Sequence, residues 1–312
     1  MIRAIGLAAG LAAALATGLA TGLATGLATG LATGLAAVLA AGLAAPAHAA
    51  PPASDLFGAM HGPSDQAPAS VGGYAAGCLA GAVPLAADGP GWQAMHPSRD
   101  RAWGRPEATA FVARLAEAGR AAGWSGLLVG DIGLARGGPM RSGHRSHQIG
   151  LDIDIWLTPA PPRPLSAAER EGMGAASVVA PDRRAVTRAW SPAHAGLLRA
   201  AAQDPAVARI FVNAAIKAEL CRAGPEGWMR KLRPWWGHDS HFHVRLACPD
   251  GDAGCVDQAP PPPGPGCDAA LAWWFSDEAL NPKPEPGAPA RRALTLADLP
   301  PSCRGVLDAA PR

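Results

Sequence analysis

Two short runs of sequence, residues 143–155 and 236–246, constrain the fold of this chain more than any other feature. Over residues 151–157 and 241–246, apolar residues alternate with histidine, aspartate or arginine, which is the pattern of a β-strand with one buried face. The polar face of the first strand carries Asp152 and Asp154, and that of the second carries His241 and His243. We therefore expect the two strands to lie together in a sheet and to direct these side chains to a common point.

Imidazole and carboxylate groups are suitable ligands for zinc in enzyme sites that keep one position open. Asp154 and His243 can meet between two adjacent strands, and His147 can reach them from the glycine-flanked loop that precedes the first strand. A single histidine on a strand is more often a solvated or packed residue. Five of the nine histidines lie in these two runs, however, which favours a catalytic zinc site over a solvated strand face.

Three protein ligands would leave one zinc position for water, whose pKa a zinc ion can lower to about 7. Peptide hydrolysis also needs a group that takes a proton from the water and passes one to the leaving amine. The helical motif His-Glu-x-x-His, which supplies a glutamate for this role, is missing, so His241 or His238 is the candidate. Asp152 could orient a ligand histidine; a surface or structural carboxylate is the alternative.

The first 49 residues have the composition of an export signal. Arg3 is the only charge before a long run of Ala, Leu, Gly and Thr, and residues 47–49 form an Ala-x-Ala cleavage site. We predict a signal peptide over 1–49, with an uncleaved membrane anchor as the alternative. No later segment of the sequence is long and apolar enough to span a bilayer, so no stable membrane insertion is expected after cleavage.

Six cysteines follow the predicted signal, and their even number indicates disulfides formed in an oxidising compartment. They are Cys78, Cys221, Cys248, Cys255, Cys267 and Cys303. Six cysteines allow 15 pairings, so the sequence alone leaves the connectivity open. No Cys-x-x-Cys pair supports the alternative of a zinc cluster.

The remaining sequence suggests an irregular segment over 50–73, one domain over 74–280 and a C-terminal tail over 281–312, tethered by its cysteine. Within the domain we expect helices at 106–124, 192–202 and 214–221, and strands at 126–130 and 209–212. The net charge is only +2, and no basic run is interleaved with aromatic residues. Nothing in the sequence therefore indicates a nucleic-acid partner.

The two runs, together with several shorter segments, resemble the penicillin-insensitive murein endopeptidases. This family belongs to a wider group of zinc peptidases that includes lysostaphin-type enzymes and D-Ala-D-Ala carboxypeptidases. The similarity extends from about Tyr74 to Phe275. It includes segments 101–107, 130–131, 137–139, 210–213, 230–235, 241–246 and 248–249. The general signature of the group, His-x6-Asp with His-x-His, is loose, whereas the extended match is specific.

The resemblance implies an α+β fold in which a small antiparallel sheet carries the zinc site, flanked by helices and disulfide-stapled loops. It implies one zinc ion per subunit and assigns the ligands to His147, Asp154 and His243. His241 and His238 then match catalytic groups beside the metal. The implied disulfides are Cys78–Cys303, Cys221–Cys267 and Cys248–Cys255.

A second metal site, described for members of the family, would use His144 and a downstream acidic residue, for which Asp182 is the nearest candidate. The histidine expected shortly after Asp182 is absent, because residues 183–185 are Arg-Arg-Ala. The sequence therefore argues against a second zinc ion.

The resemblance also implies a periplasmic enzyme that cleaves the D-alanyl–meso-diaminopimelyl cross-link of peptidoglycan, without a serine nucleophile for a β-lactam to acylate. One alternative is a zinc D,D-carboxypeptidase or dipeptidase, which trims a free stem peptide. Another is a wall-binding module that retains zinc without turnover, although the complete ligand set with His238 and His241 argues against it. Peptidoglycan is the predicted partner. Protein partners, oligomeric state and cross-link preference do not follow from the sequence.

Overall fold

The computed structural model describes residues 50–283 and 292–312, so the signal predicted over 1–49 lies outside the described residues, as does the tail segment 284–291. The described residues from Pro51 onward form one compact unit. None of the helices in the described ranges combines the length and the apolar character that crossing a bilayer requires.

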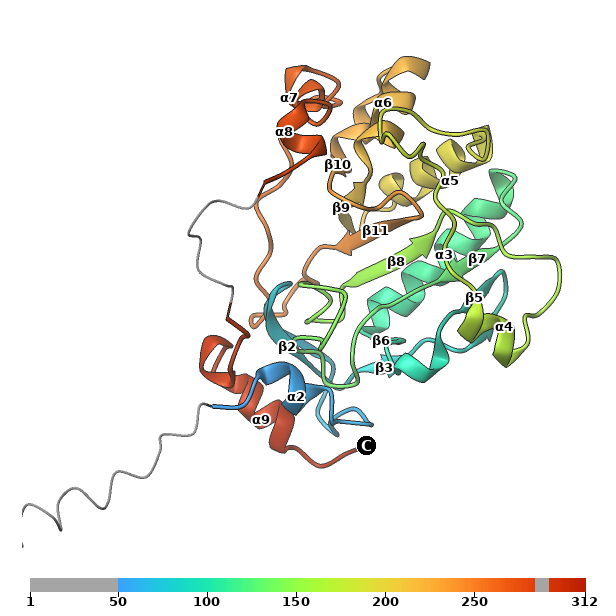
Figure 1. Cartoon of the computed structure of the whole chain (residues 1–312). Coiled ribbons are helices and arrows are strands. Elements are labelled where there is room, and N and C mark those ends of the chain that lie inside the picture. The colour runs from blue at the N-terminus through green and yellow to red at the C-terminus, as the bar shows by residue number, and fades with distance from the viewer. Residues whose placement is uncertain (1–49, 284–291) are drawn as a thin grey trace, which may run out of the picture. The chain divides into compact units, whose positions relative to one another are not determined.

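A seven-stranded sheet forms the centre of this unit, in the order β10-β9-β11-β8-β7-β5-β4 (Figure 1). Its middle contains β8 (Asp152–Trp156) and β11 (His241–Leu246), the two strands predicted from alternation. They are antiparallel, with His243 opposite Asp154 and Arg245 opposite Asp152. The expected α+β class is confirmed.

The sheet is larger than expected and mixed rather than wholly antiparallel. β9 (Val207–Val212) pairs with β11 in antiparallel fashion but with β10 (Leu232–Pro234) in parallel. On the other side, β7 (Leu127–Val129) is antiparallel to β8 and parallel to β5 (Trp92–Ala94), which pairs with β4 (Asp88–Gly89). The added strands bury the edges of the β8–β11 pair, and this fixes the backbone from which the polar side chains project.

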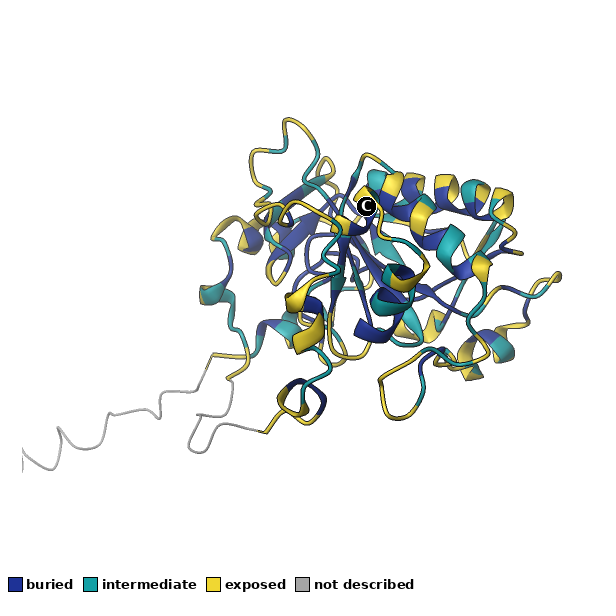
Figure 2. Ribbon diagram, turned by 90° about the horizontal axis from the view of Figure 1, so that it is seen from above, coloured by how far each residue is buried: buried dark blue, intermediate teal, exposed yellow. Residues whose placement is uncertain are grey.

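Two long helices explain why only one face of the β8–β11 pair is free for chemistry. α3 (Pro106–Ala121) and α5 (Pro192–Gln203) bury their apolar stripes in the same core as Ile153, Ile155 and Phe242. Figure 2 shows the strands of the sheet buried, while the helices expose their outer faces. Because side chains alternate along a strand, the polar residues of β8 and β11 must point to the opposite side.

The remaining helices and strands are short. Apart from the elements near the two ends of the described chain, which are given below, they are α4 (Ala167–Gly172), α6 (Ala214–Ala223), α7 (Ala269–Trp273), α8 (Asp277–Leu280), β3 (Val83–Pro84), β6 (Trp103–Gly104) and the 3-10 turns Pro97–Arg99, Gly227–Lys231 and Leu296–Asp298. Helix α3 ends three residues before its predicted limit, because Gly123 adopts a left-handed backbone with φ of +82°. The other predicted elements agree with the observed ones to within two residues at each end.

The structure differs from the expectation of an irregular segment over 50–73. Helix α2 (Ala53–Phe57) and strand β1 (Ala69–Gly73) lie there, and β1 pairs with β2 (Ala76–Ala80). Each of these two elements is only 5 residues long, too short for intrinsic preference to decide its structure, so packing does. Phe57 of α2 and Cys78 of β2 share a second apolar core with α9 (Ser302–Asp308). Helices α2 and α9 are about 250 residues apart along the chain.

Residues 292–312 are fastened to the unit through α9. Buried Arg136 donates from Nη1 to the carbonyls of Val306, Leu307 and Ala309, at 2.7, 2.8 and 2.8 Å. These carbonyls lie in the last turn of the helix and beyond it, where no intrahelical donor remains, so the guanidinium supplies both hydrogen bonds and favourable charge.

The structure contains the three disulfides that the family resemblance implies, Cys78–Cys303, Cys221–Cys267 and Cys248–Cys255, separated by 225, 46 and 7 residues. A cross-link removes more entropy from the unfolded chain when it closes a longer loop. Replacing Cys78 and Cys303 with alanine should lower the free energy of unfolding by about 5 kcal/mol, and replacing Cys248 and Cys255 by about 2 kcal/mol. Urea denaturation of both variants without reductant measures the difference, and equal losses would contradict the loop-length argument.

Candidate metal centre

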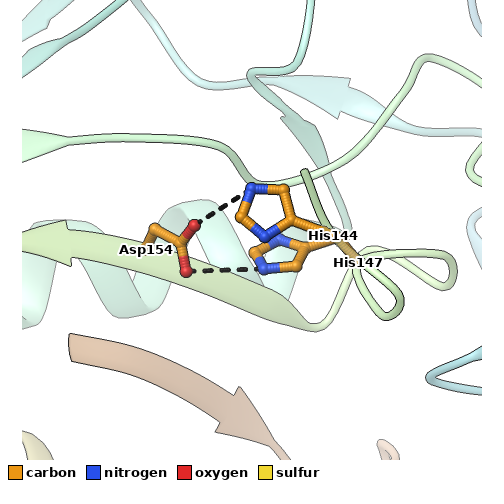
Figure 3. A group of neighbouring side chains, drawn as sticks. All are labelled: His144, His147 and Asp154. Carbon is orange, nitrogen blue, oxygen red and sulfur yellow. Dashed lines mark ion pairs between the residues drawn. The ribbon is translucent and has the colours of Figure 1, made fainter. Parts of the chain in front are cut away.

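Several imidazoles surround the carboxylate of Asp154 on the polar face of β8. Its Oδ1 lies 3.4 Å from Nε2 of His147, 3.7 Å from Nδ1 of His243 and 3.8 Å from Nε2 of His241. Its Oδ2 lies 3.4 Å from Nε2 of His144. Figure 3 shows His144 and His147, both from the loop before β8, directed at Asp154. The structure thus brings together four histidines of the two runs around one carboxylate.

Two of these atoms are buried without a hydrogen-bond partner among the described residues, Nε2 of His147 and Oδ1 of Asp154. The Nδ1 of His147 lies 2.9 Å from the carbonyl oxygen of Ile132, so Nδ1 keeps its proton and Nε2 is the nitrogen that can give up a proton to a metal. A buried polar atom left unpaired costs about 1–3 kcal/mol. A cation between the two atoms would satisfy both, and nitrogen and oxygen donors fit a zinc ion.

The ring of His243 is held by Asp152. Its Nε2–H donates to Oδ1 of Asp152 at 2.8 Å, which leaves Nδ1 free to face Asp154. The same carboxylate accepts from Nε and Nη2 of Arg245, at 2.8 and 3.2 Å, and from the backbone N–H of His147, at 2.9 Å. Although burial opposes ionisation, the charge of Arg245 and the hydrogen bond from His243 keep the pKa of Asp152 well below its usual range. Asp152 therefore orients the ring of His243 and also holds the loop that carries His147.

The loop before β8 has an unusual backbone. His147 has φ of +66°, a left-handed conformation that non-glycine residues adopt only where the surroundings impose it. Gly150 follows with φ of +73°, and a Cβ there would lie 2.5 Å from Cδ2 of Leu79. The bond from the His147 N–H to Asp152 closes this turn, so the position of His147 depends on the adjacent strand.

The electrostatic field at this point favours a positive charge. His147 is fully buried, and burial alone would lower its pKa. The carboxylates of Asp154 and Asp152 outweigh this and raise the pKa of His147 to about 9. A site that holds a proton so strongly on a buried imidazole is suited to a metal cation in its place.

His238 and His241 lie beside this group. Nδ1–H of His238 donates to the carbonyl of Trp236 at 2.9 Å, and its ring centroid is 5.0 Å from that of His241. Burial and the neighbouring His243 and His241 lower the pKa of His238 to about 4, so His238 is neutral near pH 7. The side chain of His241 is 26% exposed, at the wall of a cavity of about 430 Å³.

The two residues assigned to a second metal site are in different places. His144 joins His147 and Asp154 in a group whose potential ligand atoms all lie within 4.8 Å of one another. Asp182 is exposed, and its carboxylate accepts a hydrogen bond from the backbone N–H of Arg184. Among the described residues, Asp182 is not a member of the His144 group.

Sequence reasoning did not assign a role to Asp131, which pairs with His144 instead. Its Oδ2 lies 3.0 Å from Nε2 of His144 and accepts from Nη1 of Arg101 at 2.9 Å. Burial opposes its ionisation, but these two bonds lower the pKa of Asp131 to about 2. The available signal was its position, two residues after the buried strand β7, which lies next to β8.

The sheet thus gathers imidazoles around a buried carboxylate beside an open cavity, and this arrangement could hold a metal ion. Comparison with known proteins gives a narrower assignment. The family model described as penicillin-insensitive murein endopeptidase matches residues 70–308. The chain therefore belongs to this family of peptidases, as its motifs suggested.

Individual relatives of the chain carry the same family name. The chain is 42% identical over 249 residues to a penicillin-insensitive murein endopeptidase of Haemophilus influenzae, covering 79% of this chain and 85% of the relative. It is 42% identical over 241 residues to one of Klebsiella pneumoniae, with 77% and 86% covered. It is 41% identical over 244 residues to one of Yersinia enterocolitica, again with 77% and 86% covered.

Proposed function

We propose that the protein is a zinc-dependent endopeptidase that cleaves the D-alanyl–meso-diaminopimelyl cross-link of peptidoglycan. One observation carries the zinc requirement: the unpaired, buried Nε2 of His147 and Oδ1 of Asp154 face each other 3.4 Å apart. His243 presents Nδ1 to the same carboxylate and completes a set of three ligands. Membership of the murein endopeptidase family supports the substrate.

The chain's own residues perform the remaining tasks of the reaction. When bound, the zinc ion supplies a Lewis acid that polarises the scissile carbonyl and makes water acidic enough to attack near neutral pH. Asp152 keeps the ring of His243 in one orientation, and Trp236 does so for His238 through its carbonyl. His241 reaches the cavity and can move a proton at Nε2, from the attacking water to the leaving amine. The backbone conformation of His147 holds its ring in place before substrate arrives.

We also propose that the mature protein acts in the periplasm. The signal pattern over 1–49 and the three disulfides support this compartment. Fractionation of cells that produce the protein would find it in the periplasmic extract, and recovery in the cytosol would contradict the proposal.

Digestion of purified sacculi tests the activity. The enzyme should convert cross-linked muropeptide dimers to monomers, a chelator should abolish the conversion, and added zinc should restore it. Release of terminal D-alanine with the dimers intact would indicate a D,D-carboxypeptidase instead. Sedimentation of the protein with sacculi without any change in the muropeptides would indicate a wall-binding module.

A further inference from the structure

The cavity beside the candidate metal centre has a positively charged mouth that the reaction above does not use. It is about 430 Å³ in volume and is lined by His96, Arg99, Asp131, His144 and His241 among others. The carboxylate of Asp131 is only 3% exposed, whereas the guanidinium side chain of Arg99 is 45% exposed. A ligand that enters the cavity therefore meets an exposed cation and a covered anion.

Two arginines face Asp131, but they are not equivalent. Arg101 is 14% exposed, and its Nη1 and Nη2 donate to Asp131 and Ser142 at 2.9 and 3.2 Å. Nη1 of Arg99 lies 3.6 Å from Oδ1 of Asp131, beyond ordinary hydrogen-bond length. The carboxylate of Asp131 balances only one of the two positive charges, and the exposed carboxylate of Glu171, which also lies near Arg99, accepts two hydrogen bonds from Ser98. Arg99 thus retains both charge and donor groups for a ligand.

The backbone around Arg99 is built to present it. The 3-10 turn Pro97–Arg99 is flanked by His96 and Asp100, both left-handed with φ of +51°. A left-handed backbone costs a non-glycine residue free energy, so two such residues in a stretch of five persist only where the neighbouring structure imposes them. Helix α4 does so, because Glu171 accepts from the backbone N–H and the hydroxyl of Ser98, at 3.1 and 2.5 Å. The turn is fixed against α4 at the mouth of the cavity, so the position of Arg99 is not that of a free surface side chain.

The proposed substrate carries an anion next to the scissile bond, and Arg99 lines the same cavity as Asp154. In the D-alanyl–meso-diaminopimelyl bond, the carbon attached to the scissile nitrogen also carries a free carboxylate. The same is true of a D-Ala–D-Ala end. We infer that Arg99 binds this carboxylate of the leaving residue while the scissile carbonyl lies at Asp154 and its histidines. Arginine suits the task because its planar fork matches a carboxylate in two hydrogen bonds.

This inference rests on the proposed function and adds a specificity-determining residue to it. It explains in physical terms how one site could select a bond next to a carboxylate and reject an ordinary internal peptide bond, whose leaving residue carries a neutral amide there. Arg99 would then act on substrate choice, and the histidines on the chemical step.

A pair of soluble substrates tests the inference. One is a cross-linked muropeptide dimer with the free carboxylate beside the scissile nitrogen, and the other is the same dimer with that carboxylate amidated. The unaltered enzyme should prefer the free dimer by about 10- to 100-fold in kcat/KM, the usual value of a charge-assisted pair. Arg99→Gln should lower kcat/KM for the free dimer by a similar factor and for the amidated dimer less than threefold. For the free dimer, Arg99→Lys should have a kcat/KM between those of the unaltered enzyme and Arg99→Gln.

Arg114→Gln is the matched control, because it removes the same charge from a side chain of α3 that is 50% exposed and paired with Asp204, the residue after α5. It should leave both substrates unchanged. Equal losses on both dimers in Arg99→Gln, or no preference in the unaltered enzyme, would overturn the inference and leave the proposed function standing. An enzyme that cleaves neither dimer would contradict the proposed function, and the inference with it.

Discussion

Replacing His243 with alanine is expected to remove both bound zinc and cross-link cleavage. Nδ1 of His243 faces Asp154, and its proton lies on Nε2, in the bond to Asp152. The lone pair that would bind a metal is therefore on Nδ1, which faces Asp154. Losing an outer hydrogen-bond partner costs roughly 10- to 100-fold in metal affinity, and losing a ligand should cost more. Metal analysis by mass spectrometry and muropeptide analysis on the same preparation measure both effects.

His144→Ala is the informative comparison, because His144, His147 and Asp154 also form a compact group that could hold a metal. Nε2 of His144 is already directed to Asp131 at 3.0 Å, so its proton lies there and no lone pair is offered at that atom. We expect His144→Ala to retain about one zinc per chain. Loss of zinc in His144→Ala with retention in His243→Ala would replace His243 by His144 in the ligand set.

Much of this arrangement follows from period-two alternation. The pattern predicts that Asp154 and His243 share a face, and opposite positions in the β8–β11 ladder bring them together. The buried face of α3 likewise follows from the spacing of its apolar residues, and the start of α5 follows from Ser191 and Pro192. Local pattern is sufficient here because both elements have one apolar side that must be covered.

What the sequence could not predict depends on contacts between distant segments. His144 lies close to Asp154 rather than to Asp182 because it pairs with Asp131, which follows β7, the strand next to β8. Strand β1 and helix α2 exist because of packing against α9, which no local propensity reveals. The left-handed turn around Arg99 is likewise imposed by α4, a segment about 70 residues away along the chain.

The two histidines of β11, His241 and His243, have different surroundings. They point to the same face of the strand, but only His243 is buried and has its ring fixed by a carboxylate. Nε2 of His241 lies 3.8 Å from Oδ1 of Asp154, and its side chain is 26% exposed at the cavity. We therefore expect His241 to act on substrate without being needed for metal binding.

Replacing His241 with alanine should cut the rate of cross-link cleavage at least a hundredfold while zinc remains near one per chain. A positioned acid–base group contributes about 10²–10⁴ in rate, and a donor to a developing oxyanion about 10²–10³. If His241 only shapes the site, the rate should fall less than tenfold. If the variant loses its zinc, His241 is itself a ligand. Because metal content and cleavage are measured on one preparation, each result selects one role, and a variant with full zinc and full activity would refute the catalytic assignment.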